Sequence, residues 1–195
     1  MELYVIRHGQ SETNVDRRFG GWAQVPLTEK GMNQARSTHE KLKGIKFDRI
    51  ISSDLLRAKQ TTELVFPGCV YSEDRRLREI NVGAVLEKKC RIASLEEYGE
   101  PLRKAMENRD YRAFDGESTE DQIRRVAEFM DDLAAIPDDE RIAVVCHEGR
   151  LFSVLCYVLG VQLKYHQTEA GNASYSRFKR QNGVWKLVSW NEGSL

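Results

Sequence analysis

Two histidines directly follow apolar runs that have the length of a β-strand. His8 comes shortly after the run at residues 3–6, and His147 comes after the run at residues 142–146. If both runs are parallel strands, the two rings lie at one edge of the sheet, because ligands of such sheets bind beyond the carboxyl ends of the strands. A neutral imidazole at that edge has a ring lone pair that can attack phosphorus.

Two arginines and one carboxylate are expected at the same edge. Arg7 adjoins His8, and Arg57 lies in the first turn of the helix that is predicted after a strand at residues 47–51. Glu79 lies beyond a further predicted strand. Arginine offers fork-shaped donors that match phosphate oxygens, and it stays charged at any working pH. This set therefore predicts a binding site for a phosphate dianion.

The same residues supply the parts of a phosphoryl transfer. A histidine flanked by cations stays neutral near pH 7 and can attack a phosphomonoester. The carboxyl group of Glu79 can protonate the leaving oxygen and then activate the water that hydrolyses the phosphohistidine. The arginines, His147 and the N-terminal N–H groups of the helix that follows it would stabilise charge on the phosphoryl oxygens. We therefore expect no metal and no cofactor.

The elements that must position these residues alternate between strand and helix. Strands are predicted at residues 3–6, 47–51, 69–71, 142–146, 175–179 and 184–190, the last two flanking an Asn-Gly turn. Helices are predicted from a cap at residue 28 to about 43, from a cap within 52–54 to about 65, from 118 or 119 to about 134, and from about 150 to 159, with short helices between 95 and 109. This order predicts a three-layer α/β sandwich: a mostly parallel sheet with helices on both faces and an antiparallel edge.

Length and composition narrow the class of protein. The chain has 195 residues, which fits a single domain over residues 1–195, and 41% of them are hydrophobic. Lysine plus arginine number 30 and aspartate plus glutamate number 30, so neither a general nucleic-acid binder nor a membrane-surface binder is expected. The apolar stretches are too short to span a membrane, and the N-terminus lacks the layout of a signal peptide. The chain is therefore expected to be soluble and cytoplasmic, with residues 81–115, whose pattern is weakest, as a lid or insertion over the site.

Several blocks of residues follow one another in an order that is typical of one family. They are Arg7-His8-Gly9-Gln10-Ser11, Asn14, Arg18-Phe19-x-Gly21-Trp22, Pro26-Leu27-Thr28-x-x-Gly31, Ser52-Ser53-Asp54-Leu55-x-Arg57-Ala58-x-Gln60-Thr61, Leu77-x-Glu79, Gly116-Glu117-Ser118 and His147. Over nearly its whole length the chain thereby resembles the histidine phosphatase superfamily, which includes cofactor-dependent phosphoglycerate mutase, fructose-2,6-bisphosphatase and alpha-ribazole phosphatase. The resemblance implies the α/β sandwich fold of phosphoglycerate mutase.

The resemblance also implies catalytic roles for individual residues. His8 is implied as the nucleophile that becomes phosphorylated, and Glu79 as the proton donor. Arg7, Arg57 and His147 are implied to hold the phosphoryl group. No metal ligand is implied.

Further pocket residues and one departure follow from the same comparison of motifs. Ser11 and Asn14 are implied to complete the phosphate pocket. Gly20 stands where many members carry a glutamine or a small hydroxyl residue, so a phosphate contact is either lost there or replaced by its backbone N–H. Glu148 follows the second histidine where glycine is usual. A carboxylate at that position should repel the substrate unless it turns away to pair with Arg150.

Two other groups of residues have a bland and a sharper interpretation. The basic residues within 75–78 and 88–91 bracket Glu79, and such runs usually belong to the solvated surface. The sharper interpretation is a positive rim that draws in an anionic phosphoester. His39 and His166 match no motif, and we expect both to be structural or solvated.

Three functions fit these observations, and the favoured one is a metal-independent phosphatase of a small phosphomonoester. A cofactor-dependent phosphoglycerate mutase shares the chemistry, but mutases need a cap that excludes water, and a chain ending at Leu195 leaves little for a C-terminal tail. An inactive phosphate-binding module is motivated by Glu148, although binding alone needs no acid aligned with a nucleophile. The expected partner is a small phosphorylated metabolite, neither nucleic acid nor membrane, with the oligomeric state left open. A tryptophan common in family phosphatases is missing from residues 81–87, which leaves the identity of the substrate open. Candidates include phosphoglycerates, sugar phosphates, nucleotide monophosphates and alpha-ribazole phosphate, and phosphoproteins are a further alternative because some relatives act on them.

Overall fold

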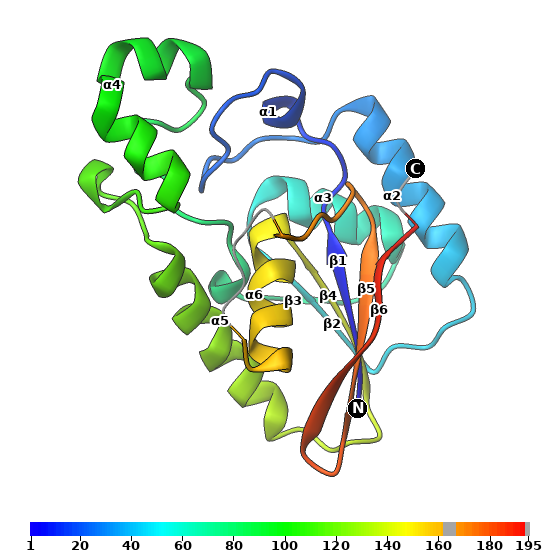
Figure 1. Ribbon diagram of the computed structural model, residues 1–195. Coiled ribbons are helices and arrows are strands. Elements are labelled where there is room, and N and C mark those ends of the chain that lie inside the picture. The colour runs from blue at the N-terminus through cyan, green and yellow to red at the C-terminus, as the bar shows by residue number, and fades with distance from the viewer. Residues whose placement is uncertain (162–166, 194–195) are drawn as a thin grey trace.

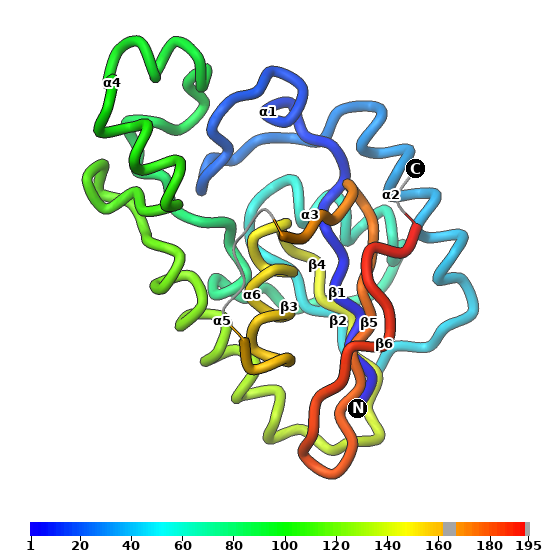
Figure 2. The backbone as a smooth tube through the Cα atoms, viewed as in Figure 1, coloured from blue at the N-terminus to red at the C-terminus, as the bar shows by residue number. Residues whose placement is uncertain are grey.

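The computed structural model describes residues 1–161 and 167–193, and within them six strands form one mixed sheet (Figures 1 and 2). The strands are β1 (Glu2–Arg7), β2 (Arg49–Ser52), β3 (Ser72–Glu73), β4 (Arg141–Cys146), β5 (Tyr175–Gln181) and β6 (Val184–Glu192). Their order across the sheet is β3-β2-β4-β1-β5-β6. The first four in this order are parallel, and β5 and β6 add an antiparallel edge, as predicted.

Helices cover both faces of this sheet. The helices are α1 (Glu12–Val15), α2 (Glu29–Leu42), α3 (Leu56–Val65), α4 (Arg91–Asn108), α5 (Thr119–Ala134) and α6 (Glu148–Leu159), with 3-10 turns at Arg75–Leu77 and Arg112–Phe114. Alternate residues of β1 face the two layers: Leu3 and Val5 join the core with α5 and α6, whereas Tyr4 and Ile6 join the core with α2 and α3 (Figure 1). Both faces of β1 and β4 are buried, which explains their continuous apolar runs and confirms the three layers.

Several helix boundaries lie where the sequence predicts them, because local caps satisfy the free N–H groups. The Thr28 side chain accepts a hydrogen bond from the N–H of Gly31 at 3.0 Å. Ser118 and Asp121 form a capping box that begins α5. Gly160 ends α6 in the left-handed conformation, with φ of 64°.

The start of α3 differs from the prediction of a cap within residues 52–54. The N-cap is Leu55, whose side chain makes no capping hydrogen bond. Instead, the Oε1 atom of Gln24 accepts the N–H of Leu56 at 2.8 Å. A partner that is distant in the sequence therefore replaces the local cap, and local pattern alone does not reveal it.

Two shorter elements also differ from the prediction. The edge strand β3 comprises residues 72–73 rather than 69–71, and the predicted long loop after β1 contains the short helix α1. The short helices predicted within 95–109 correspond to α4, in which two helical segments meet at Gly99, a residue with non-helical φ of 56°.

The segment that contains α4 packs around a small core of its own. That core comprises Phe19, Ile80, Val82, Leu86, Leu102, Ala105 and Tyr111. The segment is tied to the loop after β1, because the N–H of Lys88 bonds the carbonyl of Phe19 at 2.8 Å. Figures 1 and 2 both show α4 beside α1, above the carboxyl ends of the parallel strands.

The loop that carries His8 lies directly against α2. A Cβ atom added at Gly31 would collide with the backbone of Gln10, and one added at Gly9 would collide with the carbonyl of Gly31. Two glycines are therefore needed for this close approach of helix and loop, which fixes the path of the chain next to His8.

Replacing Gly31 by alanine tests this close approach. Alanine normally stabilises a helix interior relative to glycine by about 1 kcal/mol. Here we expect destabilisation by about 1–3 kcal/mol, because the methyl group overlaps the Gln10 backbone. Urea unfolding measures the effect, and Asn33→Ala on the exposed face of the same helix is the matched control. Equal stability of the two variants would contradict the packing described.

Candidate active site

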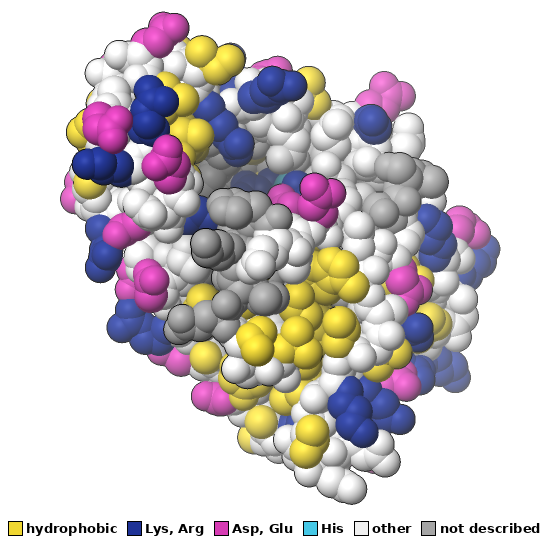
Figure 3. All heavy atoms as spheres, viewed as in Figure 1, with side chains coloured by type: hydrophobic (Ala, Val, Ile, Leu, Met, Phe, Trp, Pro, Cys, Tyr) yellow, Lys and Arg dark blue, Asp and Glu magenta, His cyan; other side chains and the backbone are white. Residues whose placement is uncertain are grey.

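A pocket of about 110 Å³ opens at the carboxyl end of β1. Its wall includes seven residues singled out from the sequence, namely Arg7, His8, Ser11, Asn14, Gly20, Arg57 and Glu79. Figure 3 shows a hollow beneath the α4 segment with basic side chains at its bottom. The structure thus brings together residues from the loop after β1, the first turn of α3 and the segment after β3.

His8 is held as a neutral ring with a defined tautomer. Its side chain is buried, and Nδ1 lies 2.6 Å from the carbonyl oxygen of Gly9. A carbonyl only accepts, so Nδ1 carries the proton and Nε2 keeps the lone pair. Burial, followed by the charges of Arg57 and Arg7, holds the pKa of His8 well below its ordinary value. The ring is therefore a nucleophile at neutral pH.

Arg57 is fixed by the loop that surrounds the pocket. Its guanidinium donates to the carbonyls of Gly21 at 3.0 Å and Ala23 at 3.1 Å. Burial lowers the pKa of Arg57 to about 10, although Glu79 and Glu87 oppose the shift. The side chain therefore stays charged near pH 7 and presents a positioned cation to the pocket.

Arg7 combines two partners with an unsatisfied donor. One Nη atom donates to the carbonyl of Ala170, and the other lies 3.2 Å from a carboxylate oxygen of Glu148. Its buried Nε atom has no hydrogen-bond partner among the described residues. Buried donors are normally satisfied, so this atom is one that an anionic ligand in the pocket can bind.

Glu79 lies against the N-terminus of α6. Its carboxylate accepts the N–H of Ile80 at 2.8 Å and the N–H of Gly149 at 3.4 Å, and it lies 3.9 Å from Arg109. Burial alone would raise the pKa of Glu79, but the charges of Arg109 and Arg150 and the Ile80 N–H, with Arg57, together hold it below its ordinary value. The carboxylate is therefore ionised near neutral pH.

Gly149 makes the position of Glu79 possible. A Cβ atom at this residue would collide with Oε1 of Glu79 and would lie 2.9 Å from Nε2 of Gln122. Only glycine leaves room for the carboxylate at the start of α6.

His147 lies beside His8 but does not line the pocket. The two ring centroids are 5.1 Å apart. The ring of His147 is fully buried, with Nε2 2.9 Å from Oγ of Ser53, and its Nδ1 has no partner among the described residues. His147 is the N-cap residue of α6, which begins at Glu148, and its ring lies between His8 and Ser53. Burial, then the charges of Arg57 and His8, hold the pKa of His147 well below its ordinary value.

Glu148 does not turn away to pair with Arg150, which corrects the expectation from the sequence. Glu148 lines the pocket and pairs with Arg7, while Arg150 is fully buried and donates to the carbonyl of Gln122 at 3.3 Å. Residues two apart on a helix point to opposite sides, which separates Glu148 from Arg150. The pocket therefore contains a carboxylate beside its cationic side chains.

The structure adds three arginines that no sequence motif indicated as site residues. Arg18, Arg91 and Arg109 line the same pocket, the last two from the two ends of α4. Of these, only Arg91 belongs to one of the two basic runs of the sequence. No sequence pattern predicts that the three side chains lie in one pocket; their proximity follows from the fold. The other run, within 75–78, is largely paired: Arg78 binds Asp54, and Arg76 binds Asp74 and Asp132.

Two of the sequence expectations concern other side chains. His39 is partly exposed and its Nδ1 lies 2.8 Å from the carbonyl of Val65, whereas His166 lies outside the described residues. Within residues 1–161 and 167–193, no group of three or more His, Cys, Asp and Glu side chains has the arrangement of a metal site. None of the helices described is long and apolar enough to cross a bilayer.

The burial of two neutral histidines predicts how stability depends on pH. In the unfolded chain His8 and His147 take up protons below about pH 6.5, whereas their lowered pKa values keep them neutral in the folded protein. The unfolded state then binds more protons, so the free energy of unfolding should fall as the pH decreases, approaching about 1.4 kcal/mol per pH unit for each histidine. Urea unfolding between about pH 7.5 and pH 5 measures this slope, above the range where carboxylates titrate.

The variant His147→Gln identifies the source of the slope. One of the two buried rings is then gone, so the slope should be roughly halved. A slope that is the same in both proteins would show that these histidines are not the buried neutral groups.

Comparison with known proteins agrees with this geometry. The model of the histidine phosphatase superfamily (branch 1) matches residues 3–193. A relative named probable phosphoglycerate mutase GpmB, from Salmonella arizonae, is 34% identical over 97% of this chain and 90% of its own length. A GpmB relative from Proteus mirabilis is 35% identical with the same coverage.

Solved structures give the same result for the fold. The alpha-ribazole phosphatase from Shigella flexneri superimposes with a TM-score of 0.90 at 25% identity, covering 100% of this chain and 98% of that one. The phosphoserine phosphatase of Entamoeba histolytica, in complex with 3-phosphoglyceric acid, gives 0.83 at 25% identity, covering 100% and 99%. Taken with the match of the family model over residues 3–193, these likenesses show that the chain belongs to branch 1 of the histidine phosphatase superfamily.

Proposed function

We propose that the protein is a metal-independent phosphatase that hydrolyses a small phosphomonoester through a phosphohistidine at His8. The observation that carries this proposal is the neutral ring of His8, whose Nδ1 is fixed by Gly9 so that Nε2 is the nucleophilic atom. Arg7 and Arg57 supply the positive charge around it. A carboxylate, Glu79, lines the same pocket and can serve as the acid.

In the first step, Nε2 of His8 attacks phosphorus and the bond from phosphorus to the ester oxygen breaks. Arg7 and Arg57 stabilise the charge on the phosphoryl oxygens. Before substrate binds, Glu79 is ionised because nearby arginines lower its pKa. A bound phosphate dianion opposes that effect and raises the pKa, so the Glu79 carboxyl takes up a proton and delivers it to the leaving oxygen.

In the second step, water attacks the phosphohistidine. The Glu79 carboxylate accepts a proton from this water while the bond between phosphorus and Nε2 of His8 breaks. Inorganic phosphate leaves and the ring returns to its neutral state. His147, beneath His8, packs against its ring and bonds Ser53, so we assign it the role of orienting the nucleophile.

Three further arginines in the pocket wall favour a leaving group that carries negative charge. They are Arg18, Arg91 and Arg109, and residues 81–115, which supply two of them, form the lid in this proposal. Two of the relatives described above are named probable phosphoglycerate mutase, and a third protein, the phosphoserine phosphatase, was solved with 3-phosphoglyceric acid, an ester with a carboxylate. An acidic phosphomonoester is therefore the first substrate to test.

A phosphoglycerate mutase is the second candidate, because relatives with that name are 34% identical to this chain. It would use the same phosphohistidine but return the phosphoryl group to another hydroxyl. The two functions differ in product. A mutase converts 3-phosphoglycerate to 2-phosphoglycerate faster than it releases phosphate.

The first test is phosphate release from a panel of phosphomonoesters, with excess chelator, by the native protein and by His8→Ala. We expect the native protein to release phosphate in chelator, because arginine and not a metal neutralises the charge. We expect no release by His8→Ala, because the nucleophile is missing. Complete loss on chelation would remove the histidine mechanism. Binding of phosphate without release from any ester would favour a phosphate-binding module.

The variant Glu79→Gln tests the role of the acid. The value of kcat/KM covers the steps up to phosphorylation of His8, so it isolates protonation of the leaving group. For alkyl phosphates we expect a decrease of about 10²–10³-fold. For p-nitrophenyl phosphate, whose leaving group departs without a proton, the decrease should be only a few-fold. Equal losses for both substrates would contradict the assignment of Glu79.

A further inference from the structure

The segment at residues 75–81 carries Glu79 and has almost no regular structure of its own. Its one regular element is the 3-10 turn at Arg75–Leu77. Carbonyl groups in such a segment have no strand or helix to bond, although buried carbonyls are normally paired. Their partner is Arg125 of α5, a residue with no assigned role.

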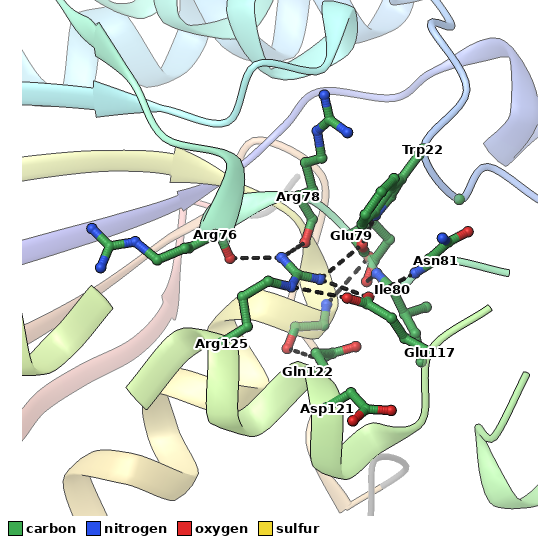
Figure 4. A network of polar contacts seen from close by, with 12 residues as sticks. Trp22, Arg76, Arg78, Glu79, Ile80, Asn81, Glu117, Asp121, Gln122 and Arg125 are labelled. Atoms are coloured by element: carbon green, nitrogen blue, oxygen red, sulfur yellow. Dashed lines mark hydrogen bonds and ion pairs between the residues drawn. The ribbon is translucent and has the colours of Figure 1, made fainter. Parts of the chain in front are cut away.

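Arg125 binds the backbone of this segment at successive points (Figure 4). Its Nη1 atom donates to the carbonyls of Arg76 at 2.7 Å and Arg78 at 3.0 Å, and it lies 3.3 Å from that of Arg75. Its Nη2 atom donates to the carbonyl of Glu79 itself at 3.3 Å. One guanidinium therefore takes the place of a strand partner for the residues that lead into the acid.

Glu117 extends the same contact to the other side of Glu79. Its carboxylate is bound by Arg125 through two bonds, of 3.1 Å and 2.8 Å, in fork-to-fork geometry. The same carboxylate accepts the N–H of Asn81 at 3.0 Å, and the N–H of Glu117 bonds the carbonyl of Asn81 at 2.8 Å. The chain is thus held both before and after Glu79.

Two further contacts leave the Glu79 backbone little freedom. The indole Nε1 of Trp22 donates to the Glu79 carbonyl at 2.8 Å, and the guanidinium of Arg125 lies 6.0 Å from the centre of that indole ring. Gln122, one turn before Arg125, donates to the carbonyl of Gly149 at 2.6 Å. The neighbouring turns of α5 therefore hold both the backbone of the acid and the glycine whose N–H faces its carboxylate.

Resting on the function proposed above, we propose that Arg125 and Glu117 are positioning residues that set the location of the Glu79 carboxyl relative to the leaving oxygen. Arg125 does not itself line the pocket, and it contacts Glu79 only through the backbone carbonyl of that residue. An acid displaced by about 1 Å loses much of its effect on proton transfer, while binding of the phosphoryl group by other residues is unaffected.

The test compares Arg125→Lys with Arg124→Gln, its neighbour on the exposed side of α5. Lysine keeps the positive charge but cannot bridge several carbonyls and a carboxylate at once. Arg124 forms a surface ion pair with Asp121, so its replacement is the matched control. For Arg125→Lys we expect kcat/KM to fall about tenfold for an alkyl phosphate and less than twofold for p-nitrophenyl phosphate. For Arg124→Gln both values should stay within twofold of the native protein.

A second comparison separates positioning from general damage to the fold. In a Glu79→Gln background, Arg125→Lys should change kcat/KM for the alkyl phosphate by less than twofold, because the group it positions is already gone. Glu117→Gln, a milder change, should show the same dependence on the leaving group. Inhibition by inorganic phosphate should be the same in the native protein, Arg125→Lys and Glu117→Gln, because these three proteins retain Glu79 together with His8, Arg7 and Arg57.

The outcomes distinguish this inference from the proposal on which it rests. If Glu79→Gln depends on the leaving group but Arg125→Lys lowers both substrates equally, or adds its full effect in the Glu79→Gln background, Arg125 is only structural and the inference is wrong. If Glu79→Gln itself shows no dependence on the leaving group, the proposed acid is wrong. Thermal unfolding of each variant shows whether the assayed protein is folded.

Discussion

The site depends first on the parallel pairing of β1 with β4. The register runs from Glu2 opposite Arg141 to Arg7 opposite Cys146, so both strands end at the same level and their following histidines become neighbours. The pairing cannot slip by one residue, because every apolar side chain of a strand that is buried on both faces would change layers. Loops, helix α6 and the α4 segment are then built around this one edge.

A shared set of cations controls both reacting groups. After burial, Arg57 is the leading cause of the lowered pKa of His8, and together with Arg109 and Arg150 it also outweighs the effect of burial on Glu79. A cation beside a base keeps the base neutral, and beside an acid it keeps the acid ionised. At the same pH the site therefore holds a neutral histidine, which the proposed first step needs, and an ionised carboxylate, which the proposed second step needs.

The sequence predicts those parts of the fold and site that depend on local pattern. Apolar runs indicate β1 and β4, and capping residues indicate the starts of α2 and α5. The position of Arg57 in the first turn of a helix correctly predicts that it reaches the pocket. What the sequence did not predict depends on contacts between distant segments: the Gln24 cap of α3, and the gathering of Arg18, Arg91 and Arg109. The sequence also predicts that α6 begins near residue 150, two residues after its actual start at Glu148. It therefore indicates neither the burial of His147 nor the pairing of Glu148 with Arg7.

The ion pair between Arg7 and Glu148 has a consequence for the end of a catalytic cycle. In the proposed reaction, inorganic phosphate leaves a site in which Arg7 is already paired with a carboxylate of the chain itself. Glu148 then takes the place of phosphate as the anionic partner of Arg7, so the charge of Arg7 does not hold the product in the site. The same carboxylate competes with the incoming ester, so weaker ground-state binding accompanies easier escape of the product.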